Sequence, residues 1–173
     1  MRDEGYDGVI VRLGERFAQI RAEDCEITAQ AGALLPRIAS VALEHRLTGF
    51  EFACGIPGSA GGALYMNAGA YGGEMKDIVS RATLLQDAEK KVVKKAALGL
   101  SYRHSALMDG GAIVLDVTYC LAPGEYDTIK GRMDELKAMR SAKQPVQLPS
   151  AGSAFKRPAN GYAAAMILSL IHI

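Results

Sequence analysis

Residues 55–72 read GIPGSAGGALYMNAGAYG, and this stretch decides which kind of fold the chain has. Together with Gly49 and Gly73 it holds eight of the chain's 19 glycines. Glycine loses more conformational entropy on folding than any other residue, so such a density needs a structural reason. The reason is either close packing of the backbone or a ligand that lies against the main chain, and the sequence alone leaves both open.

The common nucleotide-binding patterns are absent from the glycine-rich stretch. It contains no G-x-x-x-x-G-K-[ST] and no G-x-G-x-x-G that opens a helix after a strand, which excludes the P-loop and Rossmann patterns. Main-chain N–H groups around Gly58, Ser59, Gly61 and Gly62 could still bind a phosphate with few lysines or arginines. A short helix beginning at 63–66 would add the positive end of its dipole.

Composition indicates a packed globular protein of 173 residues, with 49% hydrophobic and 23% charged residues. A net charge of +1 gives no electrostatic reason to expect a nucleic acid or an anionic membrane as partner. No apolar run is long enough to span a bilayer, and the first residues do not resemble a signal peptide. Cys25, Cys54 and Cys120 are few and far apart, which favours buried thiols over disulfides or a metal site. We therefore expect a cytoplasmic protein without a bound metal.

Hydrophobic patterning predicts an α+β domain of mostly antiparallel strands. A helix is expected at 126–141, with Asp127 as its N-cap and Ile129, Met133 and Leu136 as its buried stripe. The other expected elements are strands at 8–13, 17–27, 78–85, 91–94 and 112–121, a helix at 31–47, a loop at 143–158 and a helix-like run that begins at Tyr162.

Two further segments carry chemistry that the sequence leaves ambiguous. In LSYRHS (100–105), Tyr102 and Arg103 are either ordinary surface residues or a site for a carboxylate or phosphate, which arginine binds well. In PSAGSAFKRP (149–158), Ser153 is either a turn serine or a presented hydroxyl, although the stretch is not G-x-S-x-G. His104 has no metal-ligating neighbour in the sequence, so a hydrogen-bonding role is expected for it.

In order, these segments resemble the UDP-N-acetylenolpyruvoylglucosamine reductase family. The resemblance runs from Asp3 to about Met166. It rests on GFEFACGIPGSAGGALYMNAGAYGGEM at 49–75, YRHS at 102–105 and KQP…PSAGSAFKRP at 143–158. The first and third motifs are specific to the family.

The resemblance implies the FAD-binding fold of vanillyl-alcohol-oxidase-type proteins. It places the C-terminal part of an FAD-binding domain at 1–124 and a connecting helix at 125–142. The start of a substrate-binding domain follows at 143–167, and 168–173 is expected to be a non-native tail. The family's earlier G-x-G-S-N-L-L-V-type motif and its C-terminal catalytic glutamate have no match here, so we expect the chain to be an inactive fragment. The protein is also expected to be a monomer.

The resemblance also implies a reaction and a set of site residues. NADPH would reduce FAD, and the flavin N5 would deliver a hydride to a UDP-sugar enolpyruvate, giving UDP-N-acetylmuramate for peptidoglycan. Arg103 would stabilise negative charge near the substrate carboxylate, and Ser153 would protonate the carbanion. Substrate contacts are expected from Tyr102, Arg103, Lys143, Ser153 and Arg157, the last of which stands where many relatives have asparagine. FAD contacts are expected from Gly55, Ile56, Pro57, Gly58, Ser59, Gly61, Gly62, Asn67, Gly69, Ala70 and Tyr71.

Two alternatives stay open at this stage. One is an FAD-dependent oxidase of the same fold with another substrate, although oxidase relatives lack PSAGSAFKRP. The other is a fragment that binds nothing.

Overall fold

The computed structural model describes residues 5–144, 148, 158, 161 and 163–171. The chain forms two compact units, Met1–Ala138 and Met139–Ile173. The second unit contains the end of α5 (Tyr126–Lys143) and the helix α6 (Ala163–Ile171). No helix in the described part of the chain combines the length and the apolar composition that crossing a membrane requires.

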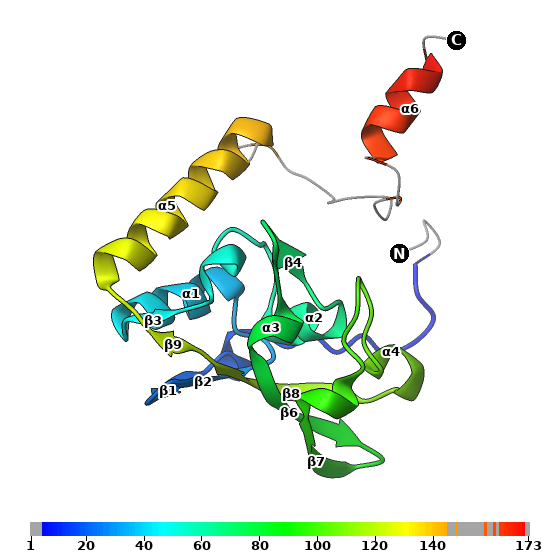
Figure 1. Cartoon of the computed structure of the whole chain (residues 1–173). Coiled ribbons are helices and arrows are strands. Elements are labelled where there is room, and N and C mark those ends of the chain that lie inside the picture. Colours follow the sequence, from blue (N-terminus) through cyan, green and yellow to red (C-terminus); the bar gives the residue numbers. More distant parts are fainter. Residues whose placement is uncertain (1–4, 145–147, 149–157, 159–160, 162, 172–173) are drawn as a thin grey trace. The chain divides into compact units, whose positions relative to one another are not determined.

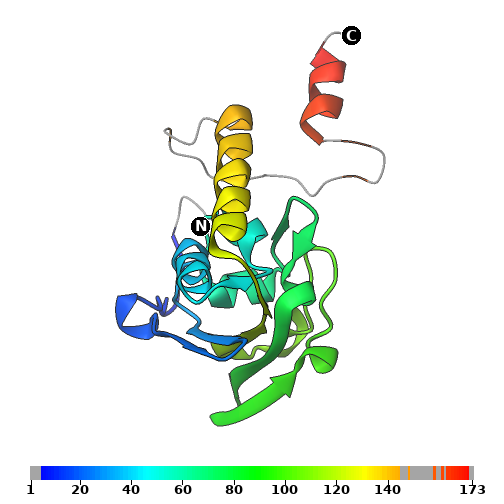
Figure 2. The ribbon, with the colours of Figure 1, turned by 60° about the vertical axis from the view of Figure 1, so that its left-hand side comes forward.

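A five-stranded antiparallel sheet forms the centre of the first unit, in the order β1-β2-β8-β6-β7. Its strands are β1 (Ile20–Glu23), β2 (Glu26–Gln30), β6 (Val79–Gln86), β7 (Glu89–Lys94) and β8 (Ile113–Cys120). The β1–β2 and β6–β7 hairpins lie at opposite edges of the sheet, with β8 between them (Figure 1, Figure 2). Strand β8 therefore joins two hairpins that are far apart in the sequence: Tyr119 faces both Ile27 and Val79.

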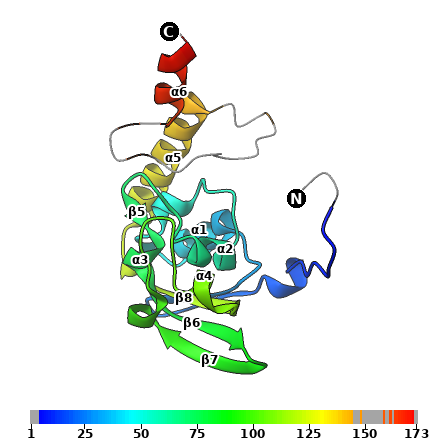
Figure 3. The ribbon, with the colours of Figure 1, turned by 90° about the vertical axis from the view of Figure 1, so that its right-hand side faces the viewer.

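Helices cover one face of this sheet, as the side view in Figure 3 shows for α1 and α2. The helices of this unit are α1 (Leu35–Glu44), α2 (Ala60–Tyr65), α3 (Met75–Ile78), α4 (Leu107–Gly110) and the first 13 residues of α5 (Tyr126–Lys143). Shorter elements connect them: η1 (Glu15–Phe17), β3 (Leu47–Thr48), η2 (Glu51–Ala53), β4 (Gly69–Ala70), β5 (Gly73–Glu74), η3 (Lys95–Leu98) and β9 (Ala122–Pro123).

The core lies where the sheet meets these helices. Ile27, Ile38, Leu64 and Val117 are fully buried there. Tyr119 is also fully buried, with its ring 5.0 Å from that of Phe50 in an edge-to-face contact. Its hydroxyl has no hydrogen-bond partner among the described residues, and desolvation by burial raises the pKa of this phenol.

The predicted α+β class and its antiparallel pairing are confirmed. Strands expected at 78–85, 91–94 and 112–121 correspond to β6, β7 and β8 within two residues at each end. The helix expected at 126–141 is α5, and Ile129, Met133 and Leu136 are buried as predicted. The run expected from Tyr162 corresponds to α6, which begins at Ala163; Tyr162 itself and most of the expected loop at 143–158 lie outside the described residues.

Two strand predictions at the N-terminal side are wrong. Residues 8–13 form no strand, and Val9 and Val11 are 88% and 79% exposed. The single strand expected at 17–27 is a turn of 3-10 helix followed by the β1–β2 hairpin, which reverses at Asp24 with φ of 50°. That turn contains neither glycine nor proline, and Asp24 alone is too weak a turn signal to separate two strands in the sequence.

Other predicted boundaries also need correction. Helix α1 is shorter than 31–47 because it begins at Leu35, with Pro36 in its first turn, where proline's fixed φ suits a helix start. Its N-cap is Leu34. Asp127 lies inside the first turn of α5, one residue past the helix start. Of the three cysteines only Cys54 is buried; Cys120 is exposed.

Candidate functional site

The glycine-rich segment, residues 55–73, folds into a short helix followed by a tight hairpin. Ser59 caps α2 by accepting a hydrogen bond from the Gly62 N–H at 3.4 Å. After α2, the β4–β5 pair turns through Tyr71 and Gly72, which have φ of 52° and 87°. Positive φ at both central residues is the type I′ geometry, for which Gly72 is suited.

Close packing explains three of the glycines in this segment. A Cβ added at Gly61 would stand 2.9 Å from the Ala31 Cβ, and one at Gly69 would stand 2.6 Å from the Gly73 carbonyl oxygen. At Gly73 it would meet the Phe52 ring at 2.6 Å. At these positions any larger residue would displace the backbone or a core side chain.

Packing does not explain Gly58 and Gly62. An added Cβ would approach only the Ile56 Cγ2 at 3.9 Å from Gly58, or the Ser59 Oγ at 3.5 Å from Gly62. Gly62 is also exposed. The two explanations left open by the sequence therefore apply to different glycines, and these two leave backbone accessible to a ligand.

The first amides of α2 are already engaged. The Ala60 N–H donates to the Ala33 carbonyl at 2.8 Å, and the Gly61 N–H donates to the Ala31 carbonyl at 2.9 Å. The sequence suggested that the amides around Gly58, Ser59, Gly61 and Gly62 could bind a phosphate. The Gly58 amide donates to the Ile56 carbonyl at 3.0 Å, so the Gly58 and Gly61 amides are engaged, and the Gly62 amide is shared with the Ser59 hydroxyl. A ligand here would meet the exposed backbone surface and the Ser59 hydroxyl.

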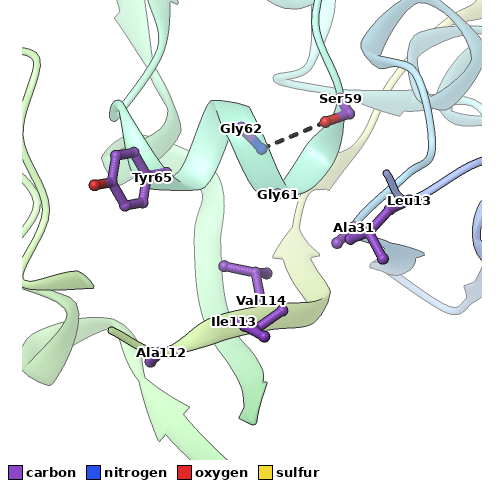
Figure 4. Close-up of a pocket in the computed structure, with 9 residues that line it drawn as sticks. All are labelled: Leu13, Ala31, Ser59, Gly61, Gly62, Tyr65, Ala112, Ile113 and Val114. Carbon is purple, nitrogen blue, oxygen red and sulfur yellow. Dashed lines mark hydrogen bonds between the residues drawn. The ribbon is translucent and has the colours of Figure 1, made fainter. Parts of the chain in front are cut away.

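A pocket of about 330 Å³ lies between α2 and the start of β8 (Figure 4). Small residues leave the backbone of its walls open, and no acidic side chain is among its lining residues. The lining residues are Leu13, Ala31, Ser59, Gly61, Gly62, Tyr65, Ala112, Ile113 and Val114. Such a wall sets no carboxylate against an anionic ligand, and it offers the Ser59 hydroxyl and apolar side chains to what binds there.

A second feature is the tight turn that presents Arg103. Ser101 and His104 exchange two backbone hydrogen bonds of 3.0 and 3.1 Å, with Tyr102 and Arg103 between them. Arg103 has φ of 53°, a conformation that costs a non-glycine residue on the order of 1 kcal/mol. Its guanidinium lies 5.7 Å from the Tyr102 ring centroid, and no carboxylate of the described residues forms a salt bridge with it.

The turn is fixed to the glycine-rich segment by two buried polar side chains. The Ser105 hydroxyl donates to the Tyr65 carbonyl at 2.7 Å, and the Asn67 amide donates to the Ser101 carbonyl at 2.9 Å. Tyr65 lines the pocket. The arginine-bearing turn is thus anchored to the helix that forms the pocket wall.

The structure brings together only part of the predicted site. Of the expected FAD contacts, Ser59, Gly61 and Gly62 line the pocket, whereas Asn67 is buried and engaged by the chain. Lys143 is the exposed last residue of α5 and belongs to the second unit. Ser153 and Arg157 lie outside the described residues.

Sequence reasoning missed several residues of this region. The pocket wall also uses Ala31, Ala112 and the first residue of β8, Ile113, which are distant in sequence from the glycines and carry no motif. Ser105 belonged to the YRHS motif but was given no role. His104 is exposed, with its Nε2 4.0 Å from an Asp109 carboxylate oxygen. The described residues contain no cluster of three or more His, Cys, Asp or Glu side chains suited to a metal.

Comparison with known proteins defines the class of this chain. Residues 2–95 match the FAD binding domain family, and the chain belongs to that family. The match includes the glycine-rich segment and the pocket residues up to Tyr65. FAD is therefore the cofactor that the family match indicates for this chain.

The individual relatives are UDP-N-acetylenolpyruvoylglucosamine reductases, which confirms the resemblance seen in the sequence. The enzyme of Limosilactobacillus reuteri is 50% identical over 166 residues, covering 95% of this chain and 55% of the relative. The Streptococcus pneumoniae enzyme (strain Hungary19A-6) is 46% identical over 168 residues, covering 96% of this chain and 56% of the relative.

A solved structure shows the same fold. UDP-N-acetylenolpyruvylglucosamine reductase (MurB) from Thermus caldophilus superposes with a TM-score of 0.76 at 33% sequence identity. The match covers 90% of this chain and 56% of that one. The chain thus spans about half the length of the relatives that it matches.

Proposed function

We propose that this chain is part of an enzyme that reduces UDP-N-acetylglucosamine enolpyruvate to UDP-N-acetylmuramate with NADPH, through FAD, in peptidoglycan precursor synthesis. The observation that carries the proposal is the anchoring of the Arg103 turn to pocket-lining helix α2 through the bond from Ser105 to Tyr65. Reduction of an enolpyruvyl double bond needs a cation near the flavin to stabilise the charge that develops on the neighbouring carboxylate.

The proposal assigns a separate role to each group of residues. Reduced FAD, when bound, supplies the hydride for the enolpyruvyl double bond. Ser59, Gly61 and Gly62 hold the cofactor against the backbone of the pocket wall. Arg103, with Tyr102 stacked against it, binds the substrate carboxylate. Ser153 donates the proton that completes the reduction, and Lys143 and Arg157 contact the anionic substrate.

Physical chemistry supports these roles. Hydride addition to the distal carbon of a double bond conjugated with a carboxylate builds negative charge on that carboxylate, where a preplaced guanidinium lowers the barrier. The carbanion then needs a proton donor in hydrogen-bond reach. Arg103 suits the first task because its planar guanidinium binds a carboxylate through two parallel hydrogen bonds and no described carboxylate occupies it.

We extend the proposal to the setting of the enzyme: a cytoplasmic monomer. The remaining expected FAD contacts complete the cofactor site in the same proposal: Gly55, Ile56, Pro57, Gly58, Gly69, Ala70 and Tyr71. Asn67 is left out because it is buried and its polar atoms are bonded within the chain. Because the chain spans about half the length of its relatives, residues 1–173 alone are expected to bind FAD weakly and not to turn over NADPH.

The test uses a protein extended to the length of the relatives. NADPH oxidation is measured with the enolpyruvyl substrate, and bound FAD is measured by absorbance. Arg103→Ala and Ser153→Ala are each expected to lower kcat by about 100-fold while FAD stays bound.

Matched controls are Arg21→Ala on exposed β1 and Ser40→Ala on α1, which remove the same side-chain types away from the pocket. Both controls are expected to keep the wild-type rate. An extended protein that binds FAD but does not reduce the substrate contradicts the proposed reaction. An unchanged rate in Ser153→Ala contradicts that residue's role.

A further inference from the structure

Asn67 is the most heavily engaged polar side chain of the glycine-rich segment. It is 2% exposed, and its Nδ2 donates to the Glu74 Oε2 at 2.7 Å and to the Ser101 carbonyl at 2.9 Å. Its Oδ1 accepts from the Lys76 N–H at 2.8 Å. The two acceptors fix the position of the amide nitrogen and the donor fixes the oxygen, so only one orientation of this amide satisfies all three partners.

These three partners come from two segments that local structure does not hold together. Glu74 is the N-cap of α3, the helix that contains Lys76, whereas Ser101 lies 34 residues after Asn67 at the base of the Arg103 turn. Glu74 itself is held by Lys76, whose Nζ lies 3.0 Å from its Oε2, and by the capping box with Asp77. Asn67 therefore ties the Arg103 turn to a rigid polar cluster.

The backbone at Asn67 supports the same conclusion. Its φ is 41°, and asparagine is one of the few residues that adopt this left-handed conformation routinely. Arg103, at the other end of the connection, is also left-handed. Two unfavourable backbone conformations persist together only where the surrounding contacts fix them, and such positions cluster at functional sites.

We propose that Asn67 is a positioning residue that sets where Arg103 stands relative to the flavin pocket, by holding the Ser101 end of the turn while Ser105 holds the other. This inference rests on the proposed function, since Arg103 is the residue through which Asn67 acts. It assigns Asn67 no contact with substrate.

Asn67→Asp is the sharpest variant. Aspartate has the same size, tolerates the same φ, and still accepts from the Lys76 N–H. It replaces the donating nitrogen with a carboxylate oxygen that faces the Glu74 carboxylate and the Ser101 carbonyl, both of which are acceptors. Asn67→Gly is the second variant, since it keeps the backbone conformation and removes the side chain without adding charge.

Thr118→Val is the matched control. Thr118 is also 2% exposed, and its hydroxyl lies 3.0 Å from that of Thr28, in the sheet and away from the turn. Valine keeps its shape and removes one buried hydrogen bond. General destabilisation should therefore appear in the control as well, whereas loss of the anchored turn should not.

The first measurement is amide hydrogen exchange on the chain itself. Both Asn67 variants are expected to speed exchange of the Ser101 and His104 amides by on the order of tenfold, with the Val117 amide of the sheet unchanged. Thr118→Val should leave the two turn amides as in the wild type. Unchanged exchange at Ser101 and His104 in both Asn67 variants would overturn the inference.

The second measurement uses the protein extended to the length of its relatives. Asn67→Asp is expected to lower kcat about tenfold with FAD content unchanged. In an Arg103→Ala background the same substitution should cost nothing further, because its effect passes through Arg103. Independent, multiplying losses would mean a purely structural role and would overturn the inference.

The two proposals fail separately. If the extended wild-type protein does not reduce the enolpyruvyl substrate, the proposed function fails and the exchange measurement alone decides whether Asn67 holds the turn. If the wild type is active and Asn67→Asp lowers kcat by the same factor in the Arg103→Ala background, the proposed function stands and the positioning role fails.

Discussion

The sheet and the glycine-rich segment are held together by different interactions. In the sheet, apolar side chains such as Ile27 and Val117 are fully buried and strand register determines their neighbours. In the glycine-rich segment, backbone packs directly on backbone at Gly61 and Gly69. Of the three buried polar side chains among the described residues, two, Asn67 and Ser105, join this segment to the Arg103 turn.

The difference follows from what each region has to do. Apolar packing stabilises a fold but tolerates shifts, because neighbouring side chains repack when volume is conserved. A buried hydrogen bond depends on the positions of both partners and leaves an unsatisfied group when one is lost. A site that places a guanidinium against a cofactor needs the second kind of contact, whereas the scaffold beneath it needs the first.

The largest expected effect is in the sheet. Ile27→Ala removes a fully buried side chain from β2 and is expected to lower the free energy of unfolding by about 2–5 kcal/mol, through lost burial and the cavity left behind. Chemical denaturation of the chain measures the change. Val92→Ala on β7 is the matched control: that side chain is 67% exposed, so its loss should cost far less. Equal costs would contradict the location of the core.

The next largest change in stability is expected at Gly61, and the neighbouring Gly62 of α2 is expected to respond in the opposite direction. Gly61→Ala is expected to lower the free energy of unfolding by about 1–3 kcal/mol, because the new methyl group would overlap Ala31. Gly62→Ala is expected to raise it by up to about 1 kcal/mol, since alanine favours helix and the position is open. Thermal or chemical denaturation of both variants measures the pair.

FAD binding distinguishes the same two variants, Gly61→Ala and Gly62→Ala, further. In a protein extended to the length of the relatives, Gly62→Ala should weaken FAD binding although the fold is more stable, because the methyl group projects from the pocket wall. A Gly62→Ala variant that is more stable and binds FAD as well as the wild type would mean that no ligand lies against this residue.

The sequence predicted the elements whose contacts are local. The stripe Ile129, Met133 and Leu136 repeats at helical spacing, and α5 buries those three residues. The same reasoning failed at 8–13, because apolar β-branched residues favour a strand only where another strand pairs with them. Pairing is set by distant parts of the chain, and no described strand pairs with Val9 or Val11.

The candidate site also contains residues that the sequence could indicate and residues that it could not. The glycine density and the YRHS motif could be singled out in the sequence because each is a short run of unusual residues. The connection between Asn67 and Ser101 could not, since a hydrogen bond between residues 34 apart leaves no periodic pattern. Nor could the sequence separate Gly61 from Gly62, because the difference depends on Ala31 across the fold.

A smaller effect is expected from the one buried hydroxyl of the sheet that has no partner among the described residues, that of Tyr119. Tyr119→Phe removes a polar group that folding desolvates, so we expect it to raise the free energy of unfolding by about 1 kcal/mol at neutral pH. The pKa of this phenol is raised above its ordinary value of 10.0 by burial.

Because the folded pKa is the higher one, the unfolded chain loses this proton first as pH rises. Wild-type stability should therefore fall by about 1.4 kcal/mol per pH unit above 10 from this group alone, and should show no such slope below 10. Tyr119→Phe should lack that component. Denaturation between pH 8 and 11 measures both slopes, and equal slopes above pH 10 would show that the hydroxyl is solvated in the folded protein.

The smallest effect is expected on the solvent side of the sheet, where Arg81 donates two hydrogen bonds of 2.8 and 2.7 Å to the Glu26 carboxylate. These bonds lower the pKa of Glu26 below its ordinary value of 4.5. The two side chains are 43% and 39% exposed, so solvent screening limits the pair to about 0.5 kcal/mol. Since the folded pKa is the lower one, this contribution is present above pH 4.5 and is lost as pH falls through the folded value.

Glu26→Gln should therefore destabilise the protein slightly at pH 7 and not at all at pH 2, as measured by denaturation at both values. Asp134→Asn, which breaks the exposed pair with Lys130 on α5, is the matched control and should have a smaller effect because that pair has a single hydrogen bond. A loss from Glu26→Gln that equals the loss from Ile27→Ala would contradict the division drawn above, because polar contacts would then hold the sheet as well.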